Sequence, residues 1–162
     1  MYRYGRKSLE VKATLHPDLA KIMQLVIERT PTDIGLHEGA RPIDRQRQYF
    51  RDGASRINPD AYSTVDELCQ VAKHITIEGH PLYGKSRAVD FHISEKHVGK
   101  TLTWDDLHFG VVIGVAMSCA KELLDKGEIS HKLRTGGDWD GDGVFVYDQR
   151  LKDLPHLEIV PV

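Results

Sequence analysis

An aspartate and a histidine stand three residues apart near the end of the chain, in the stretch Asp153-Leu-Pro-His156. A catalytic zinc site takes three protein ligands, often histidine, and keeps a fourth position open for water. It also needs a nearby carboxylate that takes a proton from that water. Because a proline stiffens the segment between them, Asp153 could serve in this way when His156 binds the metal. The alternative is a solvent-facing histidine beside a turn aspartate.

Another carboxylate lies where an apolar strand is expected. The segment Arg87–Ile93 reads Arg-Ala-Val-Asp-Phe-His-Ile, an alternating pattern that predicts a strand with Asp90 inside it. Burying an unpaired carboxylate costs free energy, so Asp90 needs a partner. A metal ion would be one such partner, and an ion pair with Arg87 or Arg41 would be the other.

A third group of carboxylates resembles half of a calcium loop. Asp138, Asp140 and Asp142 alternate before Gly143, which matches the start of a D-x-D-x-D-G loop. The twelfth position holds Gln149 instead of the bidentate glutamate of an EF-hand, and no flanking helix pair is expected, so we reject an EF-hand. Three clustered carboxylates repel one another without a cation. Calcium binding and an acidic surface turn remain as two interpretations.

The composition indicates one globular unit that could position these groups. The 162 residues are 40% hydrophobic and 28% charged, which is typical of a soluble domain spanning residues 1–162. A formal net charge of −2 argues against a general attraction to nucleic acid. The N-terminus lacks the apolar stretch of a secretory signal, and we expect no stable membrane insertion. We also expect a monomer. Cys69 and Cys119 do not make a disulfide framework, so reduced thiols are expected.

The order of helices and strands favours an α+β fold, with a small, mostly antiparallel sheet flanked by helices and the metal site on the sheet. Apolar residues at helical spacing follow Pro17, and Thr103–Asp106 offers a capping-box variant for a long helix. The helices are expected over 17–29, in a short segment ending near Gly53, over 65–72 and from 103 to about 126, and the strands over 34–38, 87–93, 132–135 and 156–160.

Taken together, the motifs resemble a known family. The chain is similar to the zinc D-alanyl-D-alanine carboxypeptidase and L-alanyl-D-glutamate endopeptidase family, especially its tailed-phage endolysins. The family signature is S-x-H-x-x-G-x-A-x-D, followed far downstream by an acidic residue, two spacers and a histidine. The segments LHPDLAKIMQLVIER, EGARPIDRQRQYFRDGAS, RAVDF and GGDWDGDG…DLPHLEI resemble successive parts of it. The resemblance covers nearly the whole chain.

The first histidine of the signature is displaced in this chain. It should stand seven residues before Asp90, where the sequence has Tyr83. His74 and His80 could each be this first histidine, with an inserted loop before Asp90. The sequence on both sides of the loop favours His74. His92 shares a strand face with Asp90, but the family pattern gives it no ligand role.

The resemblance implies a zinc site formed by His74, Asp90 and His156. Asp153 would be the general base, and Arg41 would polarise the scissile carbonyl or stabilise the oxyanion. Glu158 shares a strand face with His156 and is expected to orient it, with plain solvent exposure as the alternative.

The implied function is that of a phage endolysin, which cuts the L-alanyl-D-glutamate bond of peptidoglycan stem peptides. The protein would stay in the host cytoplasm until it is released to the cell wall. Two alternatives remain open: a D-alanyl-D-alanine carboxypeptidase, and a non-catalytic, metal-stabilised module that binds the wall.

Overall fold

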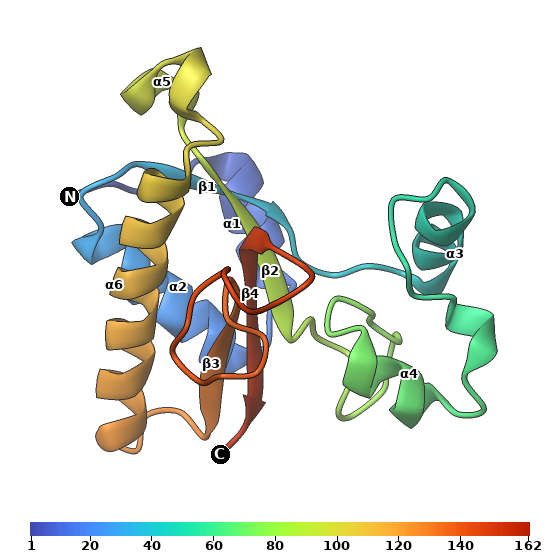
Figure 1. The fold of residues 1–162 in the computed structure, drawn as a ribbon. Helices are drawn as coiled ribbons and strands as arrows, with labels where there is room; N and C mark the ends of the chain where they lie inside the picture. Colours follow the sequence, from blue (N-terminus) through green and yellow to red (C-terminus); the bar gives the residue numbers. More distant parts are fainter.

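The fold is built on one sheet of four antiparallel strands. A computed structural model describes residues 1–162, and its strands lie in the order β1-β2-β4-β3. All three pairings are antiparallel, with Asp90 on β2 directly opposite His156 on β4. The predicted α+β class is therefore confirmed (Figure 1). The strands are β1 (Ile34–Glu38), β2 (Ala88–Ile93), β3 (His131–Gly136) and β4 (Asp153–Pro161).

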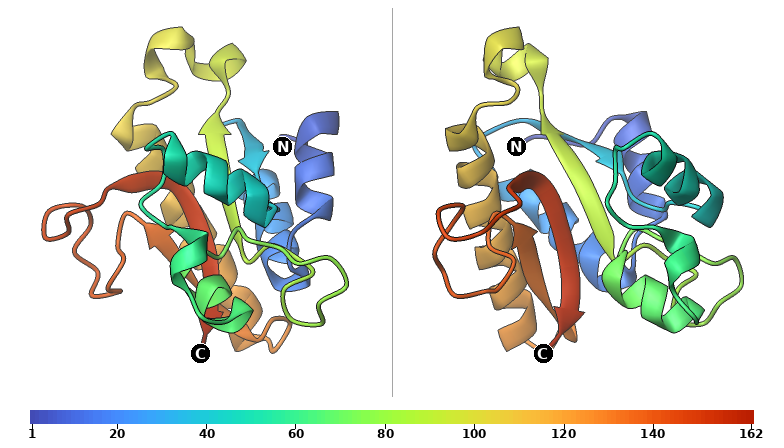
Figure 2. Two further views of the ribbon diagram at one scale, coloured as in Figure 1. Left: turned by 90° about the vertical axis from the view of Figure 1, so that its right-hand side faces the viewer. Right: turned by 45° about the vertical axis from the view of Figure 1, so that its right-hand side comes forward.

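Helices lie on both sides of this sheet. Helices α2 and α6 pack together on one side, while α3 and α4 stand on the opposite side, in front of the sheet in the left view of Figure 2. Helix α1 packs against β1. The helices are α1 (Arg6–Ala13), α2 (Pro17–Arg29), α3 (Ile43–Arg51), α4 (Val65–Val71), α5 (Glu95–Val98) and α6 (Asp106–Asp125), with short 3₁₀ helices η1 (Pro59–Ala61) and η2 (Lys100–Leu102).

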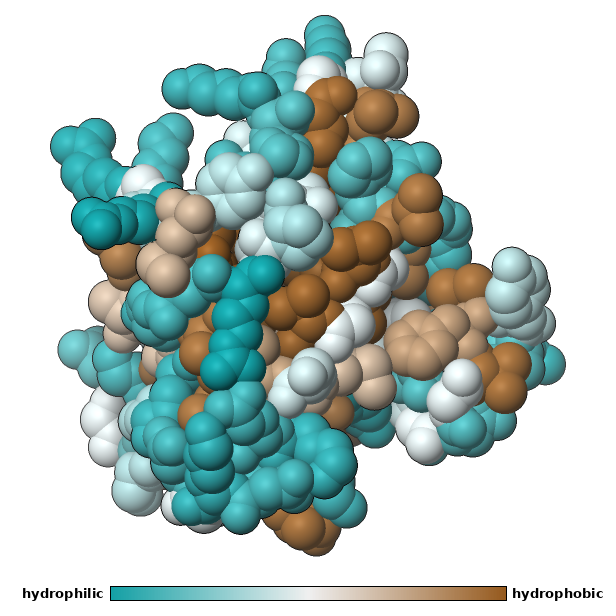
Figure 3. Space-filling model, turned by 90° about the vertical axis from the view of Figure 1, so that its left-hand side faces the viewer, coloured by the Kyte–Doolittle hydropathy of each residue, from teal (hydrophilic) through white to brown (hydrophobic).

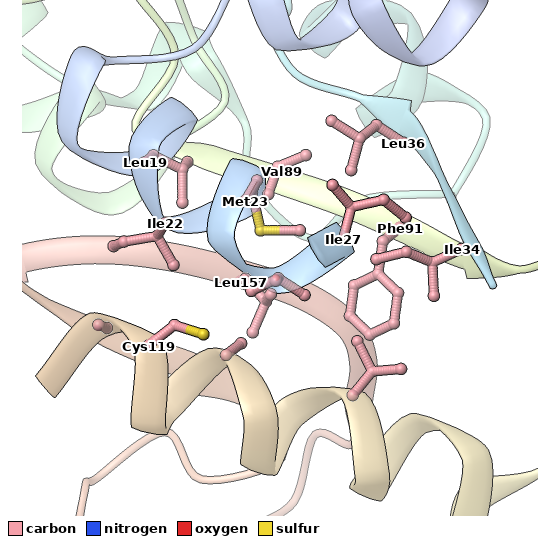
Figure 4. Close-up of a cluster of buried hydrophobic side chains, with 14 of the residues drawn as sticks. Leu19, Ile22, Met23, Ile27, Ile34, Leu36, Val89, Phe91, Cys119 and Leu157 are labelled. Atoms are coloured by element: carbon pink, nitrogen blue, oxygen red, sulfur yellow. The ribbon is translucent and has the colours of Figure 1, made fainter. Parts of the chain in front are cut away.

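The main hydrophobic core fills the space between α2, α6 and the sheet. The apolar stripe predicted for α2 is buried against strands β1, β2 and β4 (Figure 4). Phe91 of β2 contacts Phe109 of α6, with ring centroids 5.4 Å apart. Burial of this stripe is the main force that holds the sheet against its helices. The core side chains shown in Figure 4 include Leu19, Ile22, Met23, Ile27, Ile34, Leu36, Val89, Phe91, Cys119 and Leu157.

A second, smaller core lies apart from the first, around α4. Its five buried residues are Leu68, Cys69, Ala72, Ile75 and Tyr83. We call residues 39–86, which contain α3, α4 and this core, the α3–α4 segment. Two backbone hydrogen bonds between its parts, from Arg41 N to His74 O at 2.8 Å and from Thr76 N to Arg41 O at 3.1 Å, fix the chain around His74.

Three element boundaries differ from the sequence prediction. Helix α1 was not expected, because half of its residues are charged and only Ser8 is buried. The long helix begins two residues later than the predicted capping box: the Asp105 carboxylate accepts the N–H groups of Leu107 and His108, while the Thr103 hydroxyl donates to the Lys100 carbonyl. Aspartate is a strong cap, so it outcompetes the threonine.

The last strand also begins earlier than predicted. Strand β4 starts at Asp153, so the segment from Asp153 to His156 is not a turn but part of the sheet. The proline at 155 concealed this, because proline is rare inside a paired strand.

Helix α6 is the one helix that is long and apolar enough, by length and composition, to cross a membrane. Seven of its residues are buried in the protein core, among them Phe109, Ile113 and Cys119. On the side of the molecule where α6 lies, Figure 3 shows hydrophobic side chains among hydrophilic ones. Packing in the core thus explains the apolar character of these seven residues of α6.

Candidate metal centre

Two histidines and one aspartate from three parts of the chain meet on the face of the sheet away from α6. Asp90 Oδ1 lies 3.2 Å from His74 Nε2 and 3.1 Å from His156 Nδ1, and the two ring nitrogens are 3.3 Å apart. Ligand atoms about 2.0–2.1 Å from a tetrahedral zinc would lie about 3.3 Å from one another. The three atoms therefore match one triangular face of a zinc coordination tetrahedron, and the donor set suits that ion.

The remaining nitrogen of each histidine ring is held by an acceptor. His74 Nδ1 lies 2.8 Å from the Gly39 carbonyl oxygen, and His156 Nε2 lies 3.0 Å from Glu158 Oε2. Glu158 is buried and in turn accepts from the Arg134 guanidinium, with Nε at 2.9 Å. Such acceptors fix the ring orientation and make the opposite nitrogen a better ligand. Each histidine thus presents its free lone pair to the same point.

The charges around His156 favour a cation at this point. Burial alone would lower the pKa of His156, but the carboxylates of Asp90 and Glu158 raise it to about 9. Burial would raise the pKa of Asp90, but hydrogen bonds from His156 and His74 hold it well below its usual range. Asp90 therefore pairs with the two histidines, and neither Arg87 nor Arg41 is its partner.

Asp153 lies close to this group although its spacing from His156 argues against it. Residues three apart on a regular strand point to opposite faces of the sheet. Here Leu154 points into the main core, while Asp153 lines the same cavity as Asp90. Burial raises the pKa of Asp153, and the charges of His156 and Asp90 also act on it, in opposite directions.

An irregularity in β4 explains how both side chains reach one site. Thr135 of β3 pairs with Leu157 of β4, but the next residue of β3, Gly136, pairs with Asp153. The residues of β4 between Leu157 and Asp153 therefore have no partner on β3. Pro155 lies within the extra residues, where a missing N–H costs no ladder hydrogen bond. A Cβ atom on Gly136 would lie only 2.1 Å from the Asp153 carbonyl oxygen, so the close approach requires glycine.

Arg41 lies at the edge of the site with one free donor. Its guanidinium pairs with Glu38, donates to Gln46 Oε1 at 2.9 Å and stacks on the Tyr49 ring at 4.8 Å. Its Nε is buried and has no hydrogen-bond partner. Its charge acts on Asp153 and lowers the pKa of that carboxyl against the larger effect of burial. A fixed arginine beside the site supplies a positive charge that would stabilise a developing negative charge.

The other histidines considered from the sequence lie elsewhere. His80 stacks on Tyr83, with ring centroids 4.7 Å apart, and its Nδ1 accepts the N–H groups of Leu82 and Tyr83 at 3.2 Å. His92 is exposed, its ring lies against Gly35, and it does not belong to the group of His74, Asp90 and His156. The structure brings His74, and not His80, to Asp90 and His156.

The three aspartates of the predicted calcium loop lie together in the connection between β3 and β4. Their carboxylate oxygens could hold one cation. Asp138 is buried and accepts the N–H groups of Gly141 and Gly143, while Asp142 accepts that of Val144 at 2.7 Å. Helices do not flank this loop, which agrees with the rejection of an EF-hand.

A further histidine–aspartate group lies where α2 begins, and it is accounted for without a metal. His131 Nδ1 lies 2.7 Å from Asp18 Oδ2, and Ser130 donates to the same oxygen. His16 caps α2 by accepting the Asp18 N–H at 3.2 Å. The N-terminus of a helix favours anions over cations. These contacts therefore indicate a structural link between α2 and β3.

Comparison with known proteins places the chain in a family. The model of the family described as phage L-alanyl-D-glutamate peptidase matches residues 1–160. The chain belongs to this family. Among curated members, the L-alanyl-D-glutamate peptidase of Escherichia phage T5 is 26% identical over 164 residues, covering 98% of both chains.

A solved structure supports the fold of this phage peptidase family member. The L-Ala D-Glu endopeptidase ChiX of Serratia marcescens aligns with a TM-score of 0.63 at 19% identity. The alignment covers 98% of this chain and 90% of that one. At this identity the likeness establishes the shared architecture alone.

Sequence reasoning on this family member missed several supporting groups. The Gly39 carbonyl that holds His74 carries no sequence signal, because any residue supplies a carbonyl. Arg134 could have been paired with Glu158 from the register of β3 and β4, but that register depends on the irregularity at Gly136. The role expected for Glu158 fits the hydrogen bond that the structure places on His156.

Proposed function

We propose that this protein is a zinc-dependent endopeptidase that hydrolyses the L-alanyl-D-glutamate bond of peptidoglycan stem peptides. The observation that carries the proposal is the meeting of His74, Asp90 and His156 at tetrahedral ligand spacing, in a chain of this peptidase family. These three residues would hold the zinc ion, which when bound supplies a Lewis acid for the carbonyl and lowers the pKa of water.

Asp153 is the proposed general base. Its carboxylate has no hydrogen-bond or ion-pair partner in the protein that would hold it away from substrate, and it lines a cavity beside Asp90. Burial raises the pKa of this carboxyl, which makes it a stronger base than an exposed aspartate. An Asp153 oxygen accepts the proton of the attacking water and then delivers it to the departing amine nitrogen of the glutamate.

Arg41 is the proposed electrostatic stabiliser. The negative charge that develops on the scissile carbonyl oxygen needs preorganised donors. Arg41 supplies a positive charge, and Glu38, Gln46 and Tyr49 fix its side chain, so that little reorganisation is required.

As an endolysin, the protein would act on the cell wall of the phage host. We propose that it remains in the host cytoplasm as a monomer until the membrane is breached, and that its macromolecular partner is peptidoglycan. Membership of the phage peptidase family supports this placement.

The proposal is tested by digesting purified peptidoglycan with the zinc-loaded protein and identifying the fragments by mass spectrometry. We expect stem peptides with a new N-terminal glutamate, leaving L-alanine on the glycan. Loss of terminal D-alanine alone would favour the carboxypeptidase alternative. Binding to the wall without any cleavage would favour the non-catalytic module, although the fixed charge of Arg41 and the half-buried, unpaired carboxylate of Asp153 speak for a catalytic site.

A calcium ion at Asp138, Asp140 and Asp142 is a second proposal for this chain. The mutual repulsion of these carboxylates supports it, and burial together with Asp142 and Asp140 raises the pKa of neighbouring Asp148. Because the same connection leads directly into Asp153, ordering it would steady the catalytic carboxylate.

We expect added calcium to increase the activity of zinc-loaded enzyme severalfold, and Asp142→Asn to remove the response. Magnesium serves as the control ion, since it tolerates this kind of irregular oxygen site poorly. Equal activity with calcium and with a calcium-selective chelator would exclude the regulatory role.

A further inference from the structure

A cavity of about 380 Å³ opens beside Asp90 and Asp153, where β2 continues past the end of its pairing with β4. The last β2–β4 pair is Asp90 with His156, and the next position on β4 is Pro155, which has no N–H to donate. The cavity therefore begins at the candidate catalytic groups and runs along the free edge of β2. Its lining residues are His37, Asp90, Phe91, His92, Trp104, Asp106, Phe109, Lys152, Asp153, Leu154 and Pro155.

Trp104 provides an unusual wall for this cavity. Its side chain is 74% exposed, and its ring lies 5.9 Å from that of Phe109, which forms part of the floor. Polar groups of His37 and His92 surround the aromatic surface. An exposed tryptophan beside polar side chains suits a ligand that has both an apolar face and hydrogen-bonding groups.

The charges of this cavity do not suit an anion. Three carboxylates, those of Asp90, Asp106 and Asp153, line it. Its one lysine, Lys152, is already paired with Asp106. These carboxylates would repel an anionic ligand, whereas an uncharged ligand avoids this repulsion.

The opposite end of β2 has the reverse charge. Arg87 precedes the strand, and its N–H donates to the Lys73 carbonyl at 2.9 Å. Arg134 joins them through Glu158, which lies opposite both Ala88 and Arg134 in the sheet. Because Arg134 is paired with Glu158, Lys73 and Arg87 are the cations without an ion-pair partner at this end.

The peptidoglycan stem, which is the substrate in the proposed function, has a matching asymmetry of charge. The inference therefore rests on that proposed function. On the glutamate side of the scissile bond, the stem carries free carboxylates. On the alanine side, the lactyl carboxyl is consumed in an amide bond, so the muramyl sugar and its lactyl group are uncharged. We propose that the Trp104 cavity binds the muramyl sugar and lactyl–alanyl group, while the acidic part of the stem extends toward Lys73 and Arg87.

The experiment compares two substrates that differ only in the sugar: a muramyl tripeptide and the free tripeptide L-alanyl-γ-D-glutamyl-diamino acid. We expect Trp104→Ala to raise KM for the muramyl substrate about tenfold, which corresponds to the loss of one good aromatic contact. The free tripeptide should be cleaved equally by both proteins. Leu107→Ala is the matched control, because Leu107 is also 74% exposed and near the start of α6 but does not line the cavity.

Binding measurements separate this inference from the proposed function. Calorimetry with Asp153→Asn protein, with and without the additional Trp104→Ala change, gives the affinity for both compounds whether or not the wild type cleaves them. Sugar-dependent affinity that is lost with Trp104 supports the cavity assignment even if no cleavage occurs. Equal affinity for the two compounds, or an equal effect of Trp104→Ala on both, overturns it.

Discussion

Replacing Asp153 with asparagine is expected to lower kcat on peptidoglycan about a thousandfold, within the range typical for the loss of a general base. Asparagine has nearly the same shape but cannot accept the proton of the attacking water. Zinc content should stay at one ion per chain, because the ligand atoms belong to His74, Asp90 and His156. Steady-state cleavage of a defined muramyl peptide, together with metal analysis of the same preparation, measures both quantities.

The control for this change is Asp125→Asn, which alters an exposed aspartate paired with Lys121 at the end of α6. It should leave both kcat and zinc content unchanged. If Asp153→Asn retained wild-type kcat, Asp153 would not be the base. If instead the variant lost its zinc, the side chain would hold the metal site and would not act only on the proton.

Replacing His74 with alanine should remove both the metal and the activity, whereas replacing His80 should do neither. Loss of a residue that merely orients a ligand costs about 10- to 100-fold in metal affinity, and loss of a ligand should exceed that. His80 contacts only its own loop, through Leu82 and Tyr83. Equilibrium dialysis against zinc, followed by activity at saturating zinc, compares the two variants.

The reverse pattern, zinc loss in His80→Ala alone, would mean that the loop rearranges around the ion and that the geometry at His74 is incidental. Circular dichroism of both variants is needed as a check, because His74 is buried and bonded to Gly39. A folded His74→Ala protein that binds no zinc gives the clearest support.

The sheet and its main helices could be predicted because their signals are local. The apolar stripe of α2 and the alternating residues of β2 lie close to the observed elements. Helix α1 was missed because it buries little apart from Ser8, whose hydroxyl accepts the Leu36 N–H. Its position depends on a contact with β1 that no periodicity in its own residues reveals.

The candidate site was accessible from sequence for a different reason. Residue types and their order pointed to His156, Asp90 and Asp153, and the family resemblance favoured His74 over His80. Spacing alone would have placed Asp153 and His156 on opposite faces of β4. Only the shifted register at Gly136, a non-local feature, explains how they share one site. The catalytic and ligand roles themselves stay predictions.

The two hydrophobic cores have a consequence for how the site holds together. Asp90 and His156 stand on the sheet that forms one wall of the main core, whereas His74 belongs to the α3–α4 segment with its own five-residue core. A core of that size contributes little free energy, so the segment should open locally more often than the sheet. An ion bound across this boundary would be released by such openings and would suppress them in turn. The metal would then link two parts of unequal stability. The rate at which the metal dissociates would measure how often the less stable α3–α4 segment opens.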